Sequence, residues 1–129
     1  MARAKKETLI SATQHNVLAT GTNIKGDIDS EEDFRIDGAI DGNISCRGKI
    51  VVGQNGAITG NITSTNIEVF GQVKGNIICK DTLILRSTSK LIGDLKMQVI
   101  EIEPGAQIME STLSMINKGA EAEFAFSEE

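Results

Sequence analysis

A five-residue unit of the form apolar-x-Gly-x-apolar recurs along the chain and restricts the folds open to it. Its copies are Ile24–Ile28, Ile40–Ile44, Ile58–Ile62, Val73–Ile77 and Leu91–Leu95. The central glycines of successive copies are 16, 18, 15 and 18 residues apart. Self-similarity at a short, nearly fixed period predicts a repeat architecture in which each unit packs on its neighbours.

A second element, apolar-x-apolar, lies between these units. Its copies are Phe34/Ile36, Ile50/Val52, Ile67/Val69, Leu83/Leu85 and Ile100/Ile102, at steps of 16 or 17 residues. Alternation with a period of two is typical of strands with one buried face. The chain also contains 18 isoleucines among its 129 residues, and β-branched residues favour strands. A helical bundle is therefore excluded.

A unit of roughly 17 residues holds two or three short strands and cannot bury a core alone, so units must stack. We predict an all-β parallel solenoid of about six coils, each advancing about 4.8 Å. The predicted domains are a flexible N-terminal tail (1–15), the β-helix (16–113) and an acidic C-terminal tail (114–129).

Alternation also predicts which side chains face the core. If the isoleucines of each unit point inward, the unit's glycine does too, and the polar residue after the glycine points outward, in a ladder of Asp27, Asn43, Asn61, Asn76 and Asp94. Two residues beyond each unit lies another inward position, occupied by Ser30, Cys46, Ser64, Cys79 and Met97. The two cysteines are then two coils, or about 10 Å, apart, which is too far for a disulfide.

The residues give no support for catalysis, a metal or a cofactor. Nucleophilic catalysis needs a base close to the nucleophile, and the only histidine, His15, lies in the N-terminal tail. The acidic run Glu31–Asp33, with Asp29, lacks calcium-loop spacing and is interpreted as a solvated turn. A net charge of −5 and the absence of Trp and Tyr argue against nucleic acid as a partner. We therefore expect a protein that is not an enzyme.

The ends of a solenoid are its chemically distinctive part, because they leave backbone groups and the core uncovered. No convincing capping segment is recognisable at either end, so we expect end-to-end self-association. The predicted polymerisation interface contains Leu18, Ile24 and Ile28 in the first coil and Ile100, Ile102, Ile108 and Leu113 in the last.

The order and spacing of these motifs resemble those of the bactofilins, a family of bacterial polymer-forming cytoskeletal proteins. The resemblance is carried by Gly21–Ile28, Phe34–Gly38, Asp41–Ile44 and Gly53–Gly56, and it covers residues 16–113. It implies a right-handed β-helix that polymerises without nucleotide into non-polar filaments. It also implies a scaffold at the inner face of the cytoplasmic membrane that supports cell shape or localises cell-envelope proteins, with cell-wall-modifying enzymes or inner-membrane proteins as partners.

The sequence also bears on localisation and leaves two alternative functions open. We expect a cytoplasmic protein, because no apolar run reaches the length of a membrane span. Many bactofilins bind membranes through a bulky residue next to Met1, but here the first bulky apolar pair is Leu9-Ile10, so direct membrane binding is not expected. The alternatives are a left-handed β-helix acyltransferase, which needs a strict six-residue period and a catalytic histidine, and a monomeric solenoid binding module.

Overall fold

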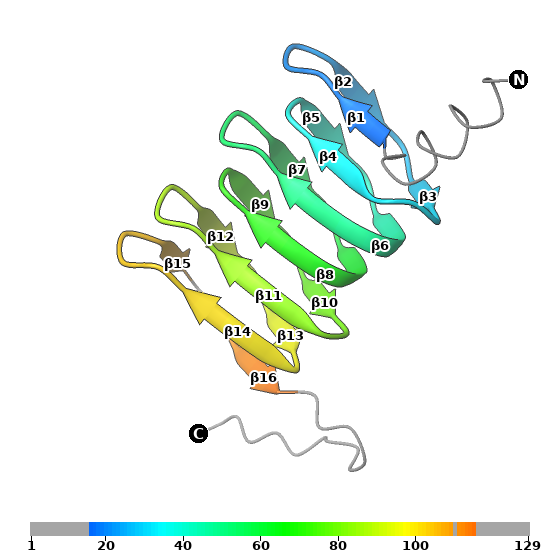
Figure 1. Cartoon of the computed structure of the whole chain (residues 1–129). Coiled ribbons are helices and arrows are strands. Elements are labelled where there is room, and N and C mark those ends of the chain that lie inside the picture. The colour runs from blue at the N-terminus through cyan, green and yellow to red at the C-terminus, as the bar shows by residue number, and fades with distance from the viewer. Residues whose placement is uncertain (1–15, 110, 116–129) are drawn as a thin grey trace, which may run out of the picture.

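The computed structural model describes residues 16–109 and 111–115. Within these ranges the secondary structure consists of sixteen short β-strands. The strands form six coils of three strands each, stacked in a row from β1 at one end to β16 at the other (Figure 1).

Each coil contributes one strand to each of three faces. The first face contains β1 (Asn16–Leu18), β4 (Phe34–Ile36), the second halves of β6 (Ile44–Val52) and β8 (Ile62–Val69), β11 (Thr82–Leu85) and β14 (Val99–Ile102). The second face contains β2 (Asn23–Lys25), β5 (Ala39–Asp41), β7 (Ala57–Thr59), β9 (Gln72–Lys74), β12 (Lys90–Ile92) and β15 (Gln107–Met109). The third face contains β3 (Ile28–Ser30), the first halves of β6 and β8, β10 (Ile77–Cys79), β13 (Leu95–Met97) and β16 (Leu113–Met115).

The strand register matches the two sequence repeats. Every pairing is parallel, and Ile62 aligns with Ile44 on one side and Ile77 on the other. The apolar pairs align in the same way, Ile67 with Ile50 and with Leu83. The predicted all-β parallel solenoid of six coils is therefore confirmed. Strand β1 begins at Asn16 and β16 extends to Met115. The N-terminal tail and most of the C-terminal tail lie outside the described residues.

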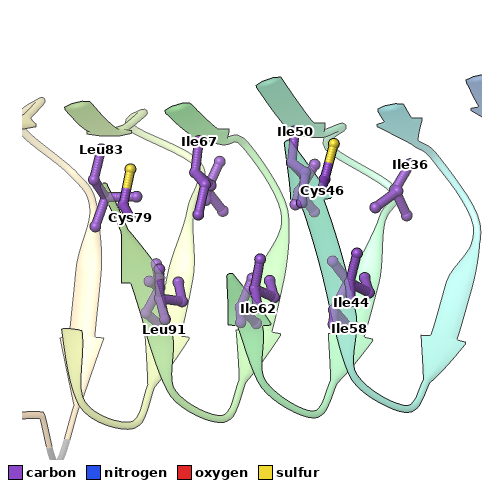
Figure 2. Close-up of a cluster of buried hydrophobic side chains, with 14 of the residues drawn as sticks. Ile36, Ile44, Cys46, Ile50, Ile58, Ile62, Ile67, Cys79, Leu83 and Leu91 are labelled. Atoms are coloured by element: carbon purple, nitrogen blue, oxygen red, sulfur yellow. The ribbon is translucent and has the colours of Figure 1, made fainter. Parts of the chain in front are cut away.

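The interior is a stack of aliphatic side chains, as the alternation predicted. Figure 2 shows Ile44 and Ile62, like Ile50 and Ile67, in successive coils of the stack. The side chains of the central coils are fully buried, with Ile62, Ile77 and Leu95 at 0% exposure. Burying an isoleucine contributes about 1.5–3 kcal/mol, so these columns supply the main stabilising free energy.

The repeated glycine lies at the corner between the second and third faces, and here the sequence interpretation was wrong. The alternation predicts that the glycine points inward, but a side chain at this position would meet the backbone of the neighbouring coil and not the core. Gly60 has φ of 146°, and a Cβ at this position would lie 2.0 Å from the carbonyl oxygen of Gly42 in the preceding coil. Close approach of successive backbones, together with a positive φ, requires glycine at this corner.

The residue after each corner glycine forms the predicted outward ladder. The corner leaves its backbone N–H out of the β-pairing, and the side chain of the equivalent residue in the preceding coil accepts that hydrogen bond. Asn61 N–H donates to Asn43 Oδ1 at 2.9 Å, and Asn76 N–H donates to Asn61 Oδ1 at 3.0 Å. The ladder begins at Asp27 and ends where Thr112 N–H donates to Asp94 Oδ1. Each coil thus satisfies a backbone donor of the next.

The small inward residues on the third face bond to backbone carbonyls of the turn that follows this face, either in their own coil or in the preceding one. Ser64 Oγ donates to the carbonyl oxygen of Gly48 at 2.7 Å, and Cys79 Sγ lies 3.0 Å from the carbonyl oxygen of Thr82. Cys46 Sγ similarly lies 3.2 Å from the carbonyl oxygen of Glu32. Hydroxyl and thiol groups are therefore preferred here because they are small and can donate to buried carbonyls.

Candidate assembly surfaces at the two ends

The first coil exposes only part of its predicted interface. Leu18 is 7% exposed and belongs to the core, while Ile24 and Ile28 are partly buried against it. Strands β1, β2 and β3 pair with the second coil on one side. Among the described residues no strand pairs with their other edge, which carries the backbone groups at this end of the solenoid.

The last coil is more open and more apolar. Ile100, Ile108 and Leu113 pack partly buried against the core, whereas Ile102 is 48% exposed. The sequence interpretation missed Met115, which is 39% exposed and pairs with Met97. Met97 had been identified as inward, so its register equivalent 18 residues later could have been found.

The two ends differ in charge by degree, because the last coil carries two carboxylates, Glu101 and Glu103, and no lysine or arginine among its described residues. The first coil and the turn after it hold five carboxylates against one lysine, a formal net charge of −4: Lys25, Asp27, Asp29, Glu31, Glu32 and Asp33. The one ion pair of this group in the described residues joins Arg47 Nη1 to Glu31 Oε2 at 3.3 Å, with both side chains more than 70% exposed. Such pairs stabilise little, so the negative charge stays largely uncompensated.

A network of ion pairs crosses the last four coils, and the sequence analysis did not find it. Glu68 Oε1 accepts from Lys49 Nζ at 3.1 Å, and Glu68 Oε2 accepts from Arg86 Nε at 2.6 Å. Arg86 Nη1 also donates to Glu103 Oε2 at 2.7 Å. Arg86 and Glu103 each directly follow the second residue of an apolar pair. Opposite charges at the same place in adjacent coils were the sequence signal that could have indicated this ion pair.

The carboxylates of this network are held ionised. Burial alone would raise the pKa of Glu68, but hydrogen bonds from Arg86 and Lys49 outweigh it and lower that pKa below its usual value. Hydrogen bonds from Arg86 and from Ser87 N–H lower the pKa of Glu103. The bonds to Glu103 and Glu68 raise the pKa of Arg86 in turn. The network therefore carries its full charge at neutral pH.

The two cysteines are free and buried in separate coils (Figure 2). Both pair with Ser64, Cys46 on one side and Cys79 on the other, which confirms that they lie two coils apart. Burial raises the pKa of both thiols, so the reactive thiolate is disfavoured at neutral pH.

The described residues provide little else for chemistry. They contain no group of three histidine, cysteine or carboxylate side chains arranged to hold a metal ion. A shallow groove on the third face, lined by Asp27, Asp29, Asn43 and Ser45, is open to solvent. Among the same residues, no helix has the length and hydropathy needed to cross a membrane.

Comparison with known proteins assigns this architecture to a protein family. A family model described as "Bactofilin: Polymer-forming cytoskeletal" matches residues 16–112. The chain belongs to the bactofilin family. It is 32% identical over 102 residues to the bactofilin BacO of Myxococcus xanthus strain DK1622, an alignment that covers 79% of each chain.

Two solved bactofilin structures have the same fold. A point mutant of the bactofilin from Thermus thermophilus superposes with a TM-score of 0.67 at 27% identity, covering 70% of this chain and all of that one. The bactofilin BacA, determined by solid-state NMR, superposes with a TM-score of 0.71 at 27% identity, covering 81% and 98%. As a bactofilin, this protein is a structural component of a polymer-forming cytoskeletal family, and self-association is the property that defines the family.

Proposed function

We propose that this bactofilin assembles end to end through its first and last coils, without nucleotide, into filaments that act as a scaffold. The observation that carries the proposal is the last coil, where Ile102 and Met115 lie exposed beside the edges of β14, β15 and β16 with which no other described strand pairs. Covering this surface with a second copy buries apolar area, at about 25 cal/mol per Å², and pairs the strand edges.

The filament is proposed to be non-polar, with like ends meeting. The family resemblance supports this arrangement. The side-chain ladder changes at the last coil, where Thr112 takes the place of the Asn or Asp of earlier coils. Its hydroxyl acceptor lies one atom closer to the backbone than Asn43 Oδ1, so a further coil would not repeat the ladder bond in its usual form.

The cellular setting of the scaffold follows from the family resemblance alone. We place the filaments in the cytoplasm, at the inner face of the cytoplasmic membrane, where they support cell shape or the position of cell-envelope proteins. Cell-wall-modifying enzymes and inner-membrane proteins are the proposed partners.

The test is assembly of the purified, apyrase-treated protein, followed by sedimentation and negative-stain electron microscopy. We expect filaments whose amount is unchanged by added ATP or GTP. A protein that stays monomeric at all concentrations and salts tried would contradict the proposal and favour a monomeric binding module. Filaments that require nucleotide would contradict the nucleotide-free mechanism.

A further inference from the structure

In the part of the chain that the structure describes, the last coil is held from one side only, so the contacts that fix it are few. Its strands pair with the fifth coil through β11, β12 and β13. In the described residues, two side chains add to this pairing from other parts of the structure. Asp94 bonds Thr112 N–H at one corner, and Arg86 pairs with Glu103 at another. The second link involves the turn that precedes β15, which contains Pro104 and Gly105.

The backbone that carries Arg86 is itself firmly placed. Ser89 is 1% exposed, and its Oγ and N–H donate to the carbonyl oxygen of Arg86 at 2.8 and 3.0 Å. Thr88 Oγ1 donates to the carbonyl oxygen of Phe70 in the preceding coil at 2.6 Å. The turn from Arg86 to Ser89 is thus fixed by contacts that do not involve the last coil.

The guanidinium group is fixed as well. Its Nη2 lies 2.5 Å from Glu68 Oε2, and Glu68 is only 12% exposed in its side chain. The guanidinium carbon lies 5.6 Å from the centre of the Phe70 ring, within cation–π distance. These contacts from the fourth coil leave Nη1 directed at Glu103 Oε2, while Glu103 Oε1 accepts from Ser87 N–H at 2.9 Å.

We propose that Arg86 is a positioning residue for assembly: it fixes the Glu103 turn and thereby holds β14 and β15 in the geometry that a second copy recognises. This inference rests on the proposed function. The neighbouring apolar residues Ile102 and Ile108 make the contact, and Arg86 acts on them through Glu103. Ordering the surface in advance reduces the entropy lost when two copies associate.

The test compares wild type with E103Q and with R86Q. E103Q removes the negative charge of the last-coil link and one of its two acceptor oxygens but leaves Arg86 paired with Glu68. The critical concentration for assembly is measured by sedimentation, hydrogen exchange at the Glu103 and Gln107 amides by mass spectrometry, and the melting temperature by circular dichroism. We expect both variants to raise the critical concentration about two- to fivefold, the range that partly exposed ion pairs give. Exchange should accelerate in the last coil while the melting temperature stays near that of wild type.

The matched control is R47Q, which removes the exposed pair with Glu31 near the other end and should leave all three measurements unchanged. The double variant R86Q/E103Q should resemble R86Q, because the two groups act through one contact. Assembly of E103Q and R86Q at the wild-type threshold would overturn the proposal, as would faster exchange and melting throughout the solenoid. A wild type that forms no filaments would instead refute the proposed function.

Discussion

The first and last coils share the same three-strand geometry but expose different surfaces. The first coil is acidic and keeps Leu18 buried, whereas the last coil presents exposed Ile102 and Met115 and is held by Arg86. If like ends meet, the first pairs two surfaces of net charge −4, and the last pairs two surfaces with more exposed apolar side chains and fewer carboxylates, Glu101 and Glu103. One fold can therefore have two junctions of unequal strength.

The largest expected effect comes from placing a charge in the apolar junction. Ile102→Arg should remove filaments and raise the assembly threshold at least about tenfold, which corresponds to a loss of roughly 1.4 kcal/mol of contact free energy. Sedimentation measures the threshold, and circular dichroism checks the fold. The matched control is Ile78→Arg. Ile78 is 40% exposed on the lateral face of β10, so this substitution should leave filaments intact. Equal loss in both variants would place the interface elsewhere.

Salt should distinguish the two junctions. Ile102→Arg leaves the acidic junction, and Ile24→Arg leaves the apolar one, so each variant should form dimers through its intact end. Raising salt from about 0.05 to about 0.5 M screens repulsion, so dimerisation of Ile102→Arg should strengthen several-fold while that of Ile24→Arg changes less than about twofold. Analytical ultracentrifugation gives both constants. Two strictly monomeric variants would indicate that unlike ends meet.

Acid should weaken the last coil through Glu103. Because the bond from Arg86 lowers the pKa of Glu103 in the folded protein, its stabilising contribution is present at neutral pH. It is lost as the pH falls below the usual glutamate value of about 4.5 and through the lowered pKa. The protection of the Glu103 and Gln107 amides from hydrogen exchange should be lower in E103Q than in wild type at pH 7, and the difference should vanish near pH 3. Lys49 and Glu68 belong to the same network, so part of the acid effect persists in E103Q.

The control for the pH experiment lies at the other end. E31Q removes the exposed pair with Arg47 and should leave the protection of the amides in the last coil unchanged at neutral and acidic pH. A difference between E31Q and wild type as large as that between E103Q and wild type would mean that both ends are stabilised by charge to the same degree.

The smallest effect concerns the thiols. Cys46 is one coil from the acidic end, and Cys79 is covered by two coils on one side and three on the other. Because solenoids open from their ends, Cys46 should react with a thiol reagent a few-fold faster than Cys79. Assembly should slow the reaction of Cys46 only. Mass spectrometry of labelled peptides measures the rates of both thiols. Equal rates for the two thiols in the unassembled protein would contradict end fraying.

The fold was predictable because its signal is repeated. Ile44, Ile62 and Ile77 recur at spacings that align them in one column. The same strand register is therefore indicated independently by several coils. The corner glycines were recognised for the wrong reason, since a period-two pattern shows that a residue alternates but not that the chain bends there. The contact of Gly60 with the Gly42 carbonyl depends on the distance between coils, which the sequence does not state.

The candidate site was only partly predictable for a related reason. Ile102 and Leu18 occupy equivalent sequence positions, but Ile102 is exposed and Leu18 is buried. This difference depends on how each end coil packs, which the sequence pattern does not reveal. Glu68, Arg86 and Glu103 are far apart in the sequence and share no short motif, although Arg86 and Glu103 occupy the same place in the repeat. Long side chains reach across coils, so their partners follow from three-dimensional register rather than local pattern.

The side-chain ladder has a mechanical consequence for a filament under tension. The hydrogen bonds between coils, including the bond from Asn61 N–H to Asn43 Oδ1, join each coil to the next along the stack. A pull along the stack loads all bonds of one layer together, and successive layers bear the same force in series. Rupture then occurs at the layer with the fewest bonds. Within a protomer the ladder adds a bond to every layer, so an overloaded filament should sever at a junction and leave folded subunits able to rejoin.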